Sequence, residues 1–335
     1  MEIINITKTY LPPLEEYTNY LEGIWDRCYL TNNGPLLKKL EAELKRYLGV
    51  KYLFMVTNGT VALQIAIKSL GIRKEIITSP FSFVATVSSI VWEGCKPVFV
   101  DIDPCNLNID TDKIEAAIDR NTEAILVPHI YGNPCDIEKI QKIAKRHRLK
   151  IIFDAAHTFG VRYKKRALAA YGDISILSFH ATKIFHTIEG GAMLTNDERI
   201  ARKISYMRNF GFKSRESFFG LGINGKNSEF HAAMGLCILP RVKNIIKERK
   251  RIAKVYNELL FKKDLGLKKP KIREGTLYNY SYYPIILPSE KILLDIQREL
   301  NKNNIFPRRY FYPSLNKLNY VVDCRMENAD RISKK

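Results

Sequence analysis

The sequence predicts an α/β protein with a mostly parallel central sheet and helices on both faces. Up to about residue 230, short runs rich in β-branched residues alternate with longer amphipathic segments. This pattern is typical of a parallel sheet whose strands are joined by helices. The chain has 335 residues, 46% of them hydrophobic, which is enough for a large core. We expect a large domain over residues 1–235 and a smaller C-terminal α/β domain over residues 236–335.

Two helices are expected before the first strand. The segment "PLEEYTNYLEGIWDRC" (13–28) follows a double proline and places its large apolar side chains at helical spacing. After the loop "LTNNGP", the segment "LLKKLEAELKRYLG" (36–49) ends in a glycine, a residue common just beyond the end of a helix.

The central part of the chain reads as a doubly wound fold. A strand over 52–57 leads through a tight turn into a helix that is closed by Gly71. Further strands are predicted at 75–79, 96–102, 123–130, 150–155 and 174–179, with helices between several of them. Open parallel sheets bind ligands outside the carboxyl ends of their strands, so the residues just after each strand are the most informative.

The C-terminal part is predicted to begin with one long helix over 229–261, kinked near Pro240. A strand over 280–287 and a helix over 289–304 follow. The last segment, "ENADRISKK", opens like a helix with Asn328 or Asp330 as its cap, but is too short to be stable without packing. Either this segment docks as it stands or residues are missing beyond it.

The charged residues of the sequence limit the classes of molecule that the protein is expected to bind. The formal charge of +19 suits a phosphate-bearing substrate, and it also raises nucleic acid or an anionic membrane as partners. The basic residues are spread along the chain, and no zinc module or RNA-binding aromatic signature stands beside the densest runs. We therefore interpret the charge as solvated helix and loop faces, and expect no nucleic-acid partner.

Cysteine and histidine spacing argues against a metal site or structural disulfides. The six cysteines are scattered without a C-x-x-C pair, and the six histidines form no H-E-x-x-H motif. The opening "MEIINITKTY" lacks the basic start and apolar run of a secretory signal, and no stretch reaches the length of a membrane helix. We expect a cytoplasmic protein with no membrane partner.

The first strand-end motif is Asn58-Gly59-Thr60. It stands between a strand and a helix, whose free N–H groups and dipole would hold a phosphate, with the Thr60 hydroxyl as a further donor. Taken alone, the motif is equally an ordinary helix N-cap.

The second strand end carries Asp154, in "IIFDAAHTFG". A carboxylate there can pair with a protonated pyridine nitrogen and keep a cofactor ring electron-withdrawing. The alternative is an Asp that caps the next helix. His157 either packs in the core or lines the site.

The third strand end, "SFHATKIF", places Lys183 in the loop beyond the strand over 174–179. Partial desolvation by Ile184 and Phe185 would lower the pKa of the amine and let it attack a carbonyl, forming a Schiff base. The alternative is a surface lysine whose charged end reaches solvent.

The fourth strand end, "SPFSFVAT" (79–86), offers Phe81 and Phe83 to stack on a planar ring, although either could simply pack in the core. A phosphate cradle, a ring stacker, a pyridinium partner and a lysine, each at a strand end, together describe a site for pyridoxal 5'-phosphate (PLP).

The chain also resembles a known family along nearly its whole length. The segments that carry the resemblance are "YLTNNGP", "VTNGTVALQ", "TSPFSFVAT", "PVFVDID", "VPHIYGNPCD", "FDAAHTFG", "GDISILSFHATK", "EGGAMLTND", "GINGKNSEFHAAMGL" and "YFYP". They resemble the DegT/DnrJ/EryC1/StrS family of sugar aminotransferases, a fold-type I PLP group acting on nucleotide-linked keto-sugars.

The resemblance implies roles for named residues. Lys183 would bind the cofactor covalently, Asp154 would pair with the pyridine nitrogen and Phe83 would stack on the ring. His157 would lie near the ring oxygen, and the phosphate would be held by Gly59, Thr60 and Ser178.

The resemblance also implies a homodimer with the active site at its interface, in which Asn224 and Lys226 would reach the neighbour's phosphate. Family members usually continue well beyond a segment like "ENADRISKK", so the small domain is expected to be incomplete.

Within the family, the motifs are most similar to enzymes that aminate C4 of dTDP-4-keto-6-deoxy-D-glucose with L-glutamate as donor, for O-antigen synthesis. The sugar nucleotide would be faced by Thr31, Asn33, Tyr310 and Tyr312. The alternatives are transamination at C3 or of a UDP-linked sugar, or a basic nucleic-acid-binding regulator.

Overall fold

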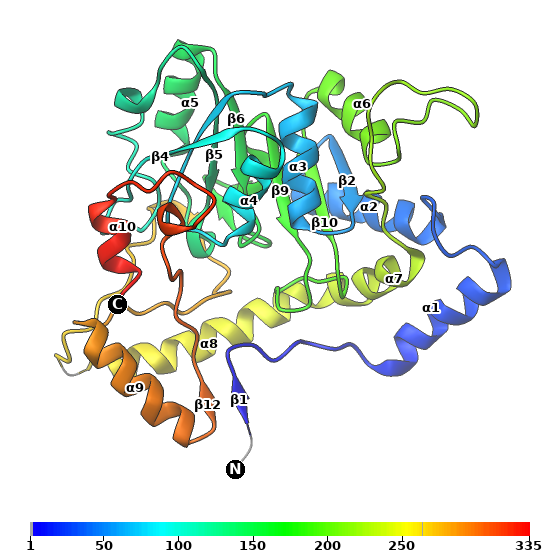
Figure 1. The fold of residues 1–335 in the computed structure, drawn as a ribbon. Helices are drawn as coiled ribbons and strands as arrows, with labels where there is room; N and C mark the ends of the chain where they lie inside the picture. Colours follow the sequence, from blue (N-terminus) through cyan, green and yellow to red (C-terminus); the bar gives the residue numbers. More distant parts are fainter. Residues whose placement is uncertain (1–2, 263) are drawn as a thin grey trace.

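A computed structural model describes residues 3–262 and 264–335. Within these residues, the centre of the molecule is a seven-stranded sheet in the order β2-β10-β9-β6-β5-β3-β4 (Figure 1). Only β10 runs antiparallel to its neighbours; the other adjacent strands are parallel. The strands are β2 (Tyr52–Val56), β3 (Glu75–Thr78), β4 (Lys96–Phe99), β5 (Thr122–Pro128), β6 (Lys150–Asp154), β9 (Ile174–Ser178) and β10 (Gly191–Thr195). The predicted mostly parallel sheet is therefore confirmed.

Helices cover both faces of this sheet, as predicted. Along β5, Ala124 and Leu126 pack with α3 and α6 on one face, whereas Ile125 and Val127 pack with α5 on the other. Alternate residues of a strand point to opposite faces, so both faces of the sheet are apolar and buried. The helices up to residue 238 are α1 (Leu14–Arg27), α2 (Pro35–Leu48), α3 (Gly59–Ser69), α4 (Ala85–Trp92), α5 (Ile137–His147), α6 (Glu198–Met207) and α7 (Glu229–Ile238).

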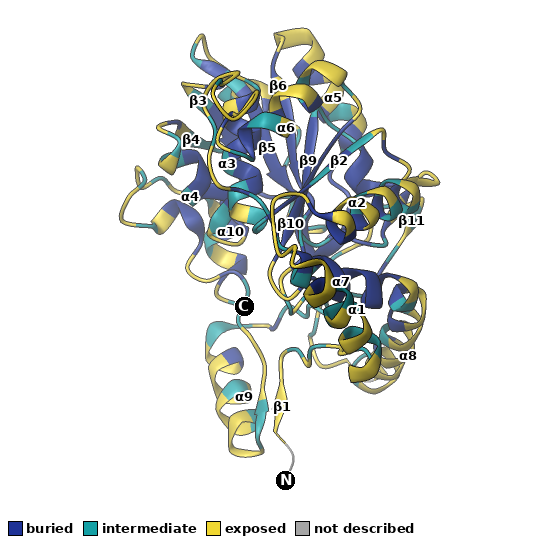
Figure 2. Ribbon diagram, turned by 90° about the vertical axis from the view of Figure 1, so that its right-hand side faces the viewer, coloured by how far each residue is buried: buried dark blue, intermediate teal, exposed yellow. Residues whose placement is uncertain are grey.

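The predicted kinked helix is confirmed. Helix α7 continues through a 3₁₀ turn (Leu239–Arg241) into α8 (Val242–Leu260), with Pro240 at the junction. Together they cross below the sheet toward the C-terminal part, where the predicted helix is α9 (Glu290–Lys302) with Ser289 as its N-cap (Figure 1). Figure 2 shows the central strands buried, whereas α9 and the outer face of α8 are largely exposed. Among the described helices, none combines the length and hydrophobicity that a bilayer crossing requires.

The prediction of a strand over residues 280–287 is wrong. Among these residues only Ile286 is paired, in an isolated bridge with Lys268. Tyr280 has a left-handed backbone (φ 53°), and Pro284 has no N–H to donate, so neither residue suits a regular ladder.

The start of the chain belongs with the C-terminal part. Strand β1 (Ile4–Asn5) pairs in parallel with β12 (Ile305–Phe306), and the two lie side by side in Figure 1. Farther along, the carbonyl of Tyr10 lies 2.7 Å from Nε2 of His186, in the loop that holds Lys183. The first residues therefore contact both the C-terminal part and that loop.

The last segment packs against the rest of the chain. Helix α10 (Glu327–Ile332) is short, and it buries Ala329 and Ile332. The predicted caps are wrong, because the N-cap position is Met326, which makes no side-chain cap. Instead Asp101, beyond β4, accepts hydrogen bonds from the N–H groups of Asn328 (2.8 Å) and Ala329 (2.9 Å). A distant carboxylate thus satisfies the free donors of this helix.

Candidate active site

Lys183 lies just beyond β9 and is partly buried, with Ile184 and Phe185 fully enclosed behind it. Its Nζ donates a hydrogen bond to the hydroxyl of Tyr282 at 3.1 Å. The pKa of Lys183 is lowered, chiefly because burial disfavours the ammonium, although the charge of Asp154 opposes this shift. A lysine with more neutral amine is a better nucleophile. The alternative of an ordinary surface lysine is not what the structure shows.

Asp154 is the last residue of β6 and is 7% exposed. Its Oδ2 accepts a hydrogen bond from Oγ1 of Thr86 (2.8 Å), and its Oδ1 accepts one from the N–H of Ala156 (3.1 Å). Burial raises the pKa of Asp154, while these hydrogen bonds and Lys183 favour the ionised form. No helix starts directly after Asp154, so the alternative of a helix cap is wrong.

The Asn58-Gly59-Thr60 motif forms the N-terminus of α3. The Asn58 side chain caps the helix by accepting from the N–H of Val61 (2.9 Å). The first N–H groups of a helix have no intrahelical partner, so those of Gly59 and Thr60 remain available to an anion. Capping and anion binding are therefore compatible at this motif.

Two glycines allow three strand ends to approach one another here. A Cβ at Gly59 would lie 3.3 Å from Cβ of Ser178, which places the end of β9 against the start of α3. A Cβ at Gly191, the first residue of β10, would lie 2.7 Å from the carbonyl oxygen of Asn58. Side chains at these glycines would press on Ser178 and on the backbone of Asn58, so the glycines permit this close approach.

Aromatic rings form the other side of the Lys183 site. The Tyr282 ring lies 4.6 Å from that of His157 and 5.8 Å from that of Tyr310, measured between centroids. Nδ1 of His157 accepts from the N–H of Tyr131 (3.1 Å), and burial lowers the pKa of this histidine, so its neutral form is favoured. His157 packs against the rings of Tyr131 and Phe311, and it also lies beside Tyr282, the partner of Lys183, so both alternatives for His157 describe part of its surroundings.

Sequence reasoning did not identify Thr86, Tyr131 or Tyr282 as site residues. Thr86 belongs to the segment "SPFSFVAT" quoted above, and Tyr131 directly follows a predicted strand. Their positions after strands could therefore have marked both residues as candidates for the site. Tyr282 lies in the segment wrongly predicted to be a strand, and only the fold brings it to Lys183.

Two other predicted residues, Phe83 and Tyr312, are exposed. Phe83 is 48% exposed just before α4, whereas Phe81 is buried edge-on against Phe311 in the core. Phe83 is thus the phenylalanine still available to a ring. Tyr312 is half exposed and lies under the guanidinium of Arg309 (3.4 Å from Cζ to the ring centroid).

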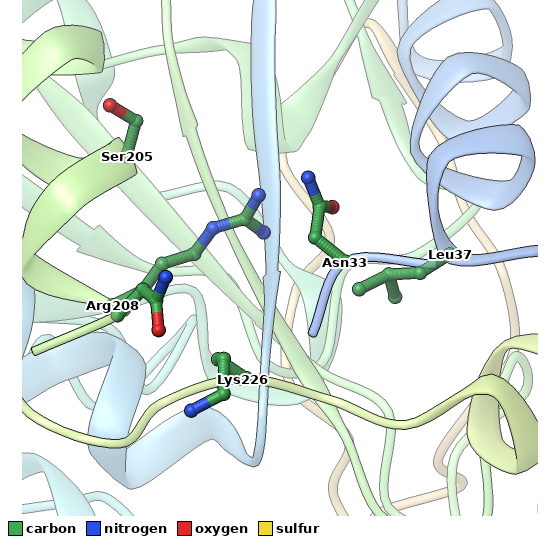
Figure 3. A pocket seen from close by; sticks show the side chains of 6 residues that line it. Asn33, Leu37, Ser205, Arg208 and Lys226 are labelled. Carbon is green, nitrogen blue, oxygen red and sulfur yellow. The ribbon is translucent and has the colours of Figure 1, made fainter. Parts of the chain in front are cut away.

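The remaining predicted residues gather elsewhere. Asn33 and Lys226 line a small cavity of about 70 Å³ together with Arg208 (Figure 3). Nζ of Lys226 donates to the side chain of Asn224 (2.6 Å). Thr31 is exposed in the loop between α1 and α2. Among the described residues, this group shares no hydrogen bond with the Lys183 site.

The site fits PLP. It combines an amine with a lowered pKa, a buried carboxylate and a helix N-terminus opened by glycines, all at the carboxyl ends of neighbouring strands. A planar pyridinium ring with a phosphate needs these three groups.

Comparisons with known proteins agree. The profile of the DegT/DnrJ/EryC1/StrS aminotransferase family matches residues 14–335. The chain is 44% identical to a dTDP-4-amino-4,6-dideoxy-D-glucose transaminase of Shigella dysenteriae (99% of this chain, 92% of that protein). It is 42% identical to one of Escherichia coli (94% and 85%). It superimposes with a TM-score of 0.94 on DesI, crystallised in the presence of its TDP-sugar product, at 30% identity (100% and 86%). The chain therefore belongs to the DegT/DnrJ/EryC1/StrS aminotransferase family, whose members use PLP.

Proposed function

We propose that the protein transfers an amino group from L-glutamate to C4 of dTDP-4-keto-6-deoxy-D-glucose, giving dTDP-4-amino-4,6-dideoxy-D-glucose. The observation that carries the reaction type is the partly buried Lys183 amine, hydrogen-bonded to Tyr282 and near the Asp154 carboxylate. The choice of sugar is supported by the names of the two relatives that are 44% and 42% identical.

Each residue has a defined task in this reaction. PLP, when bound, supplies an electron-withdrawing ring that stabilises negative charge on the carbon bearing the amine. Lys183 would hold PLP through its amine and, when that amine is free, would remove the α-proton of glutamate and later deliver a proton to C4 of the sugar. Asp154 would keep the pyridine nitrogen protonated through its negative charge.

The other groups hold the cofactor in place. The N–H groups of Gly59 and Thr60 and the hydroxyl of Ser178 would bind the phosphate. Phe83 would cover one face of the ring, and His157 would lie beside it. Tyr282 orients the Lys183 amine through the hydrogen bond between their side chains.

The active unit that we propose is a homodimer. Asn224 and Lys226 would reach the partner's phosphate, and Thr31, Asn33, Tyr310 and Tyr312 would face the sugar nucleotide. Support comes from the segment before Asn224, which exposes a cluster of large apolar side chains of the kind that marks interaction surfaces. Its members, at least 39% exposed, are Phe210, Phe212, Phe218, Phe219, Leu221 and Ile223.

We further propose that the reaction takes place in the cytoplasm and feeds O-antigen synthesis. All six cysteines are free thiols, a state that a reducing compartment preserves.

Two measurements test the proposal. Purified protein should absorb in the near-ultraviolet or visible range, and borohydride should fix a pyridoxyl group on Lys183, detectable by mass spectrometry of peptides. A panel of dTDP- and UDP-linked 3-keto and 4-keto sugars, each with glutamate, should give product only from dTDP-4-keto-6-deoxy-D-glucose. A folded protein that gains no absorbance with added PLP would contradict the cofactor assignment, and a different preferred sugar would contradict the substrate.

A further inference from the structure

Two arginines stand beside the hydrogen-bonded pair of Lys183 and Tyr282. Arg308 is exposed, and its Cζ lies 4.9 Å from the ring centroid of Tyr310, which packs edge-on against Tyr282. Burial lowers the pKa of Lys183, and the positive charge of Arg308 adds to that shift. Burial raises the pKa of Tyr282, and the positive charges of Arg308 and of Arg249, on α8, oppose that rise. The reacting amine is thus flanked by positive charge on the side of the C-terminal part.

The two arginines differ in how many of their hydrogen-bond donors already have a partner in the protein. Nη1 of Arg249 donates to the carbonyl of Ser281 (3.1 Å), and this side chain is only partly exposed. Arg249 therefore supports the segment that presents Tyr282. Arg308 forms no ion pair with any carboxylate in residues 3–262 or 264–335, and its guanidinium faces solvent. Its guanidinium interacts with the side chain of Tyr310, and the donors that do not face Tyr310 are available to a ligand.

The adjacent Arg309 provides a contrast within the same segment. Its Nη2 is 2.5 Å from Oε1 of Glu290, its Nε donates to the carbonyl of Ser333 (3.2 Å), and its guanidinium lies over Tyr312. Arg309 is already occupied by structural partners, so a ligand role is confined to Arg308.

Because Arg308 lies on the Lys183 side of the site, it suits an anion that is attached close to the reacting nitrogen. A guanidinium binds carboxylates and phosphates through paired hydrogen bonds. In an amino-acid donor, the α-carboxylate is attached to the same carbon as the reacting nitrogen, so it must lie close to Lys183. In a nucleotide sugar, the diphosphate is attached at C1, across the sugar ring from the reacting C4.

We propose that Arg308 binds the α-carboxylate of the amino donor and so makes the site specific for an amino acid in the first half of the reaction. This inference rests on the proposed function, because it takes glutamate as the donor. Arg308 acts through substrate contact, and Tyr310, packed beneath its guanidinium, positions it.

The test compares Arg308→Gln with the matched control Arg309→Gln in the PLP-loaded enzyme. Each half-reaction is followed separately by stopped-flow absorbance, first with L-glutamate alone, then with the aminated enzyme and the keto-sugar. Loss of a charge-assisted contact should raise the apparent Kd for glutamate by roughly 10- to 100-fold in Arg308→Gln. The sugar half-reaction should change by less than about twofold. Arg308→Lys, which keeps the charge without the paired donors, should fall in between.

A binding measurement without turnover accompanies the kinetics. Glutarate, a dicarboxylate that cannot react, is titrated calorimetrically into each holoenzyme, and Arg308→Gln should weaken its binding while Arg309→Gln does not. Equal glutamate Kd values in wild type and Arg308→Gln would overturn the inference. A loss of rate confined to the sugar half-reaction would also overturn it and would assign Arg308 to the diphosphate. If the wild-type enzyme reacts with the amino-sugar but not with glutamate, the proposed donor is wrong. The wild-type enzyme alone shows this result, so it can be distinguished from a failure of the Arg308 assignment.

Discussion

The ends of the central strands and the irregular C-terminal segment supply opposite halves of the site. Asp154, Ser178 and the start of α3 are fixed by a sheet whose strands are buried on both faces. Tyr282, Tyr310 and Arg308 come from stretches without regular pairing, held mainly by ring contacts. A rigid sheet suits groups that must hold one cofactor, whereas loops are where substrate contacts commonly lie. The comparison predicts that replacing a reacting side chain in the first region lowers turnover more than replacing a side chain in the second region does.

Lys183→Ala should have the largest effect. It removes the amine that we propose carries the proton in both half-reactions, so turnover should fall by at least about 10⁴-fold. Turnover and the mass of the borohydride-treated protein measure this, and circular dichroism should show an unchanged fold. Residual turnover within tenfold of wild type would contradict the assignment.

Asp154→Asn should be next. The amide keeps the shape and can still accept from Thr86, but it lacks the charge that holds the ring proton, so kcat should fall by roughly 10²- to 10³-fold. PLP content, measured after dialysis, serves as the control, because a loss of cofactor would give the same rate for a different reason. A cofactor-replete variant with normal kcat would refute the role.

Tyr282→Phe should lower turnover by about tenfold, the effect of one hydrogen bond to a charged group. The acceptor favours the ammonium, so its removal should lower the already depressed pKa of Lys183 further. In apo-protein, the rate of PLP uptake rises with pH as the amine loses its proton. Its midpoint should lie below the ordinary 10.5 in wild type and lower still in the variant. A midpoint that moves upward would contradict the hydrogen bond.

Gly191→Ala should have the smallest effect on chemistry and a visible one on stability. The added Cβ would lie 2.6 to 2.9 Å from the backbone of Asn58 and Gly59, which should destabilise the fold by about 1–3 kcal/mol and weaken PLP binding. The matched control is Gly220→Ala, where no atom lies within 4 Å of the new Cβ. Thermal unfolding with and without PLP compares the two, and equal Tm values would count against the close approach.

The sequence predicted the first region well and the second poorly. Strand positions and the residues after them follow from local periodicity and turn residues, which is why Lys183 and Asp154 could be named. By contrast, Tyr282 reaches Lys183 across 99 residues of chain, and Asp101 caps α10 from 227 residues away. Such contacts depend on the assembled fold, because no local pattern encodes them.

The pairing of β1 with β12 gives the start of the chain an influence on a site that it does not touch. Ile4 and Asn5 add a strand beside Ile305 and Phe306, and Arg308 follows two residues later. The same N-terminal stretch meets the lysine loop where the carbonyl of Tyr10 approaches His186. It therefore connects the segment that carries Arg308, which we assign to the donor carboxylate, with the loop that carries Lys183. A bulky protein fused to this end of the chain would change the distance between Arg308 and Lys183.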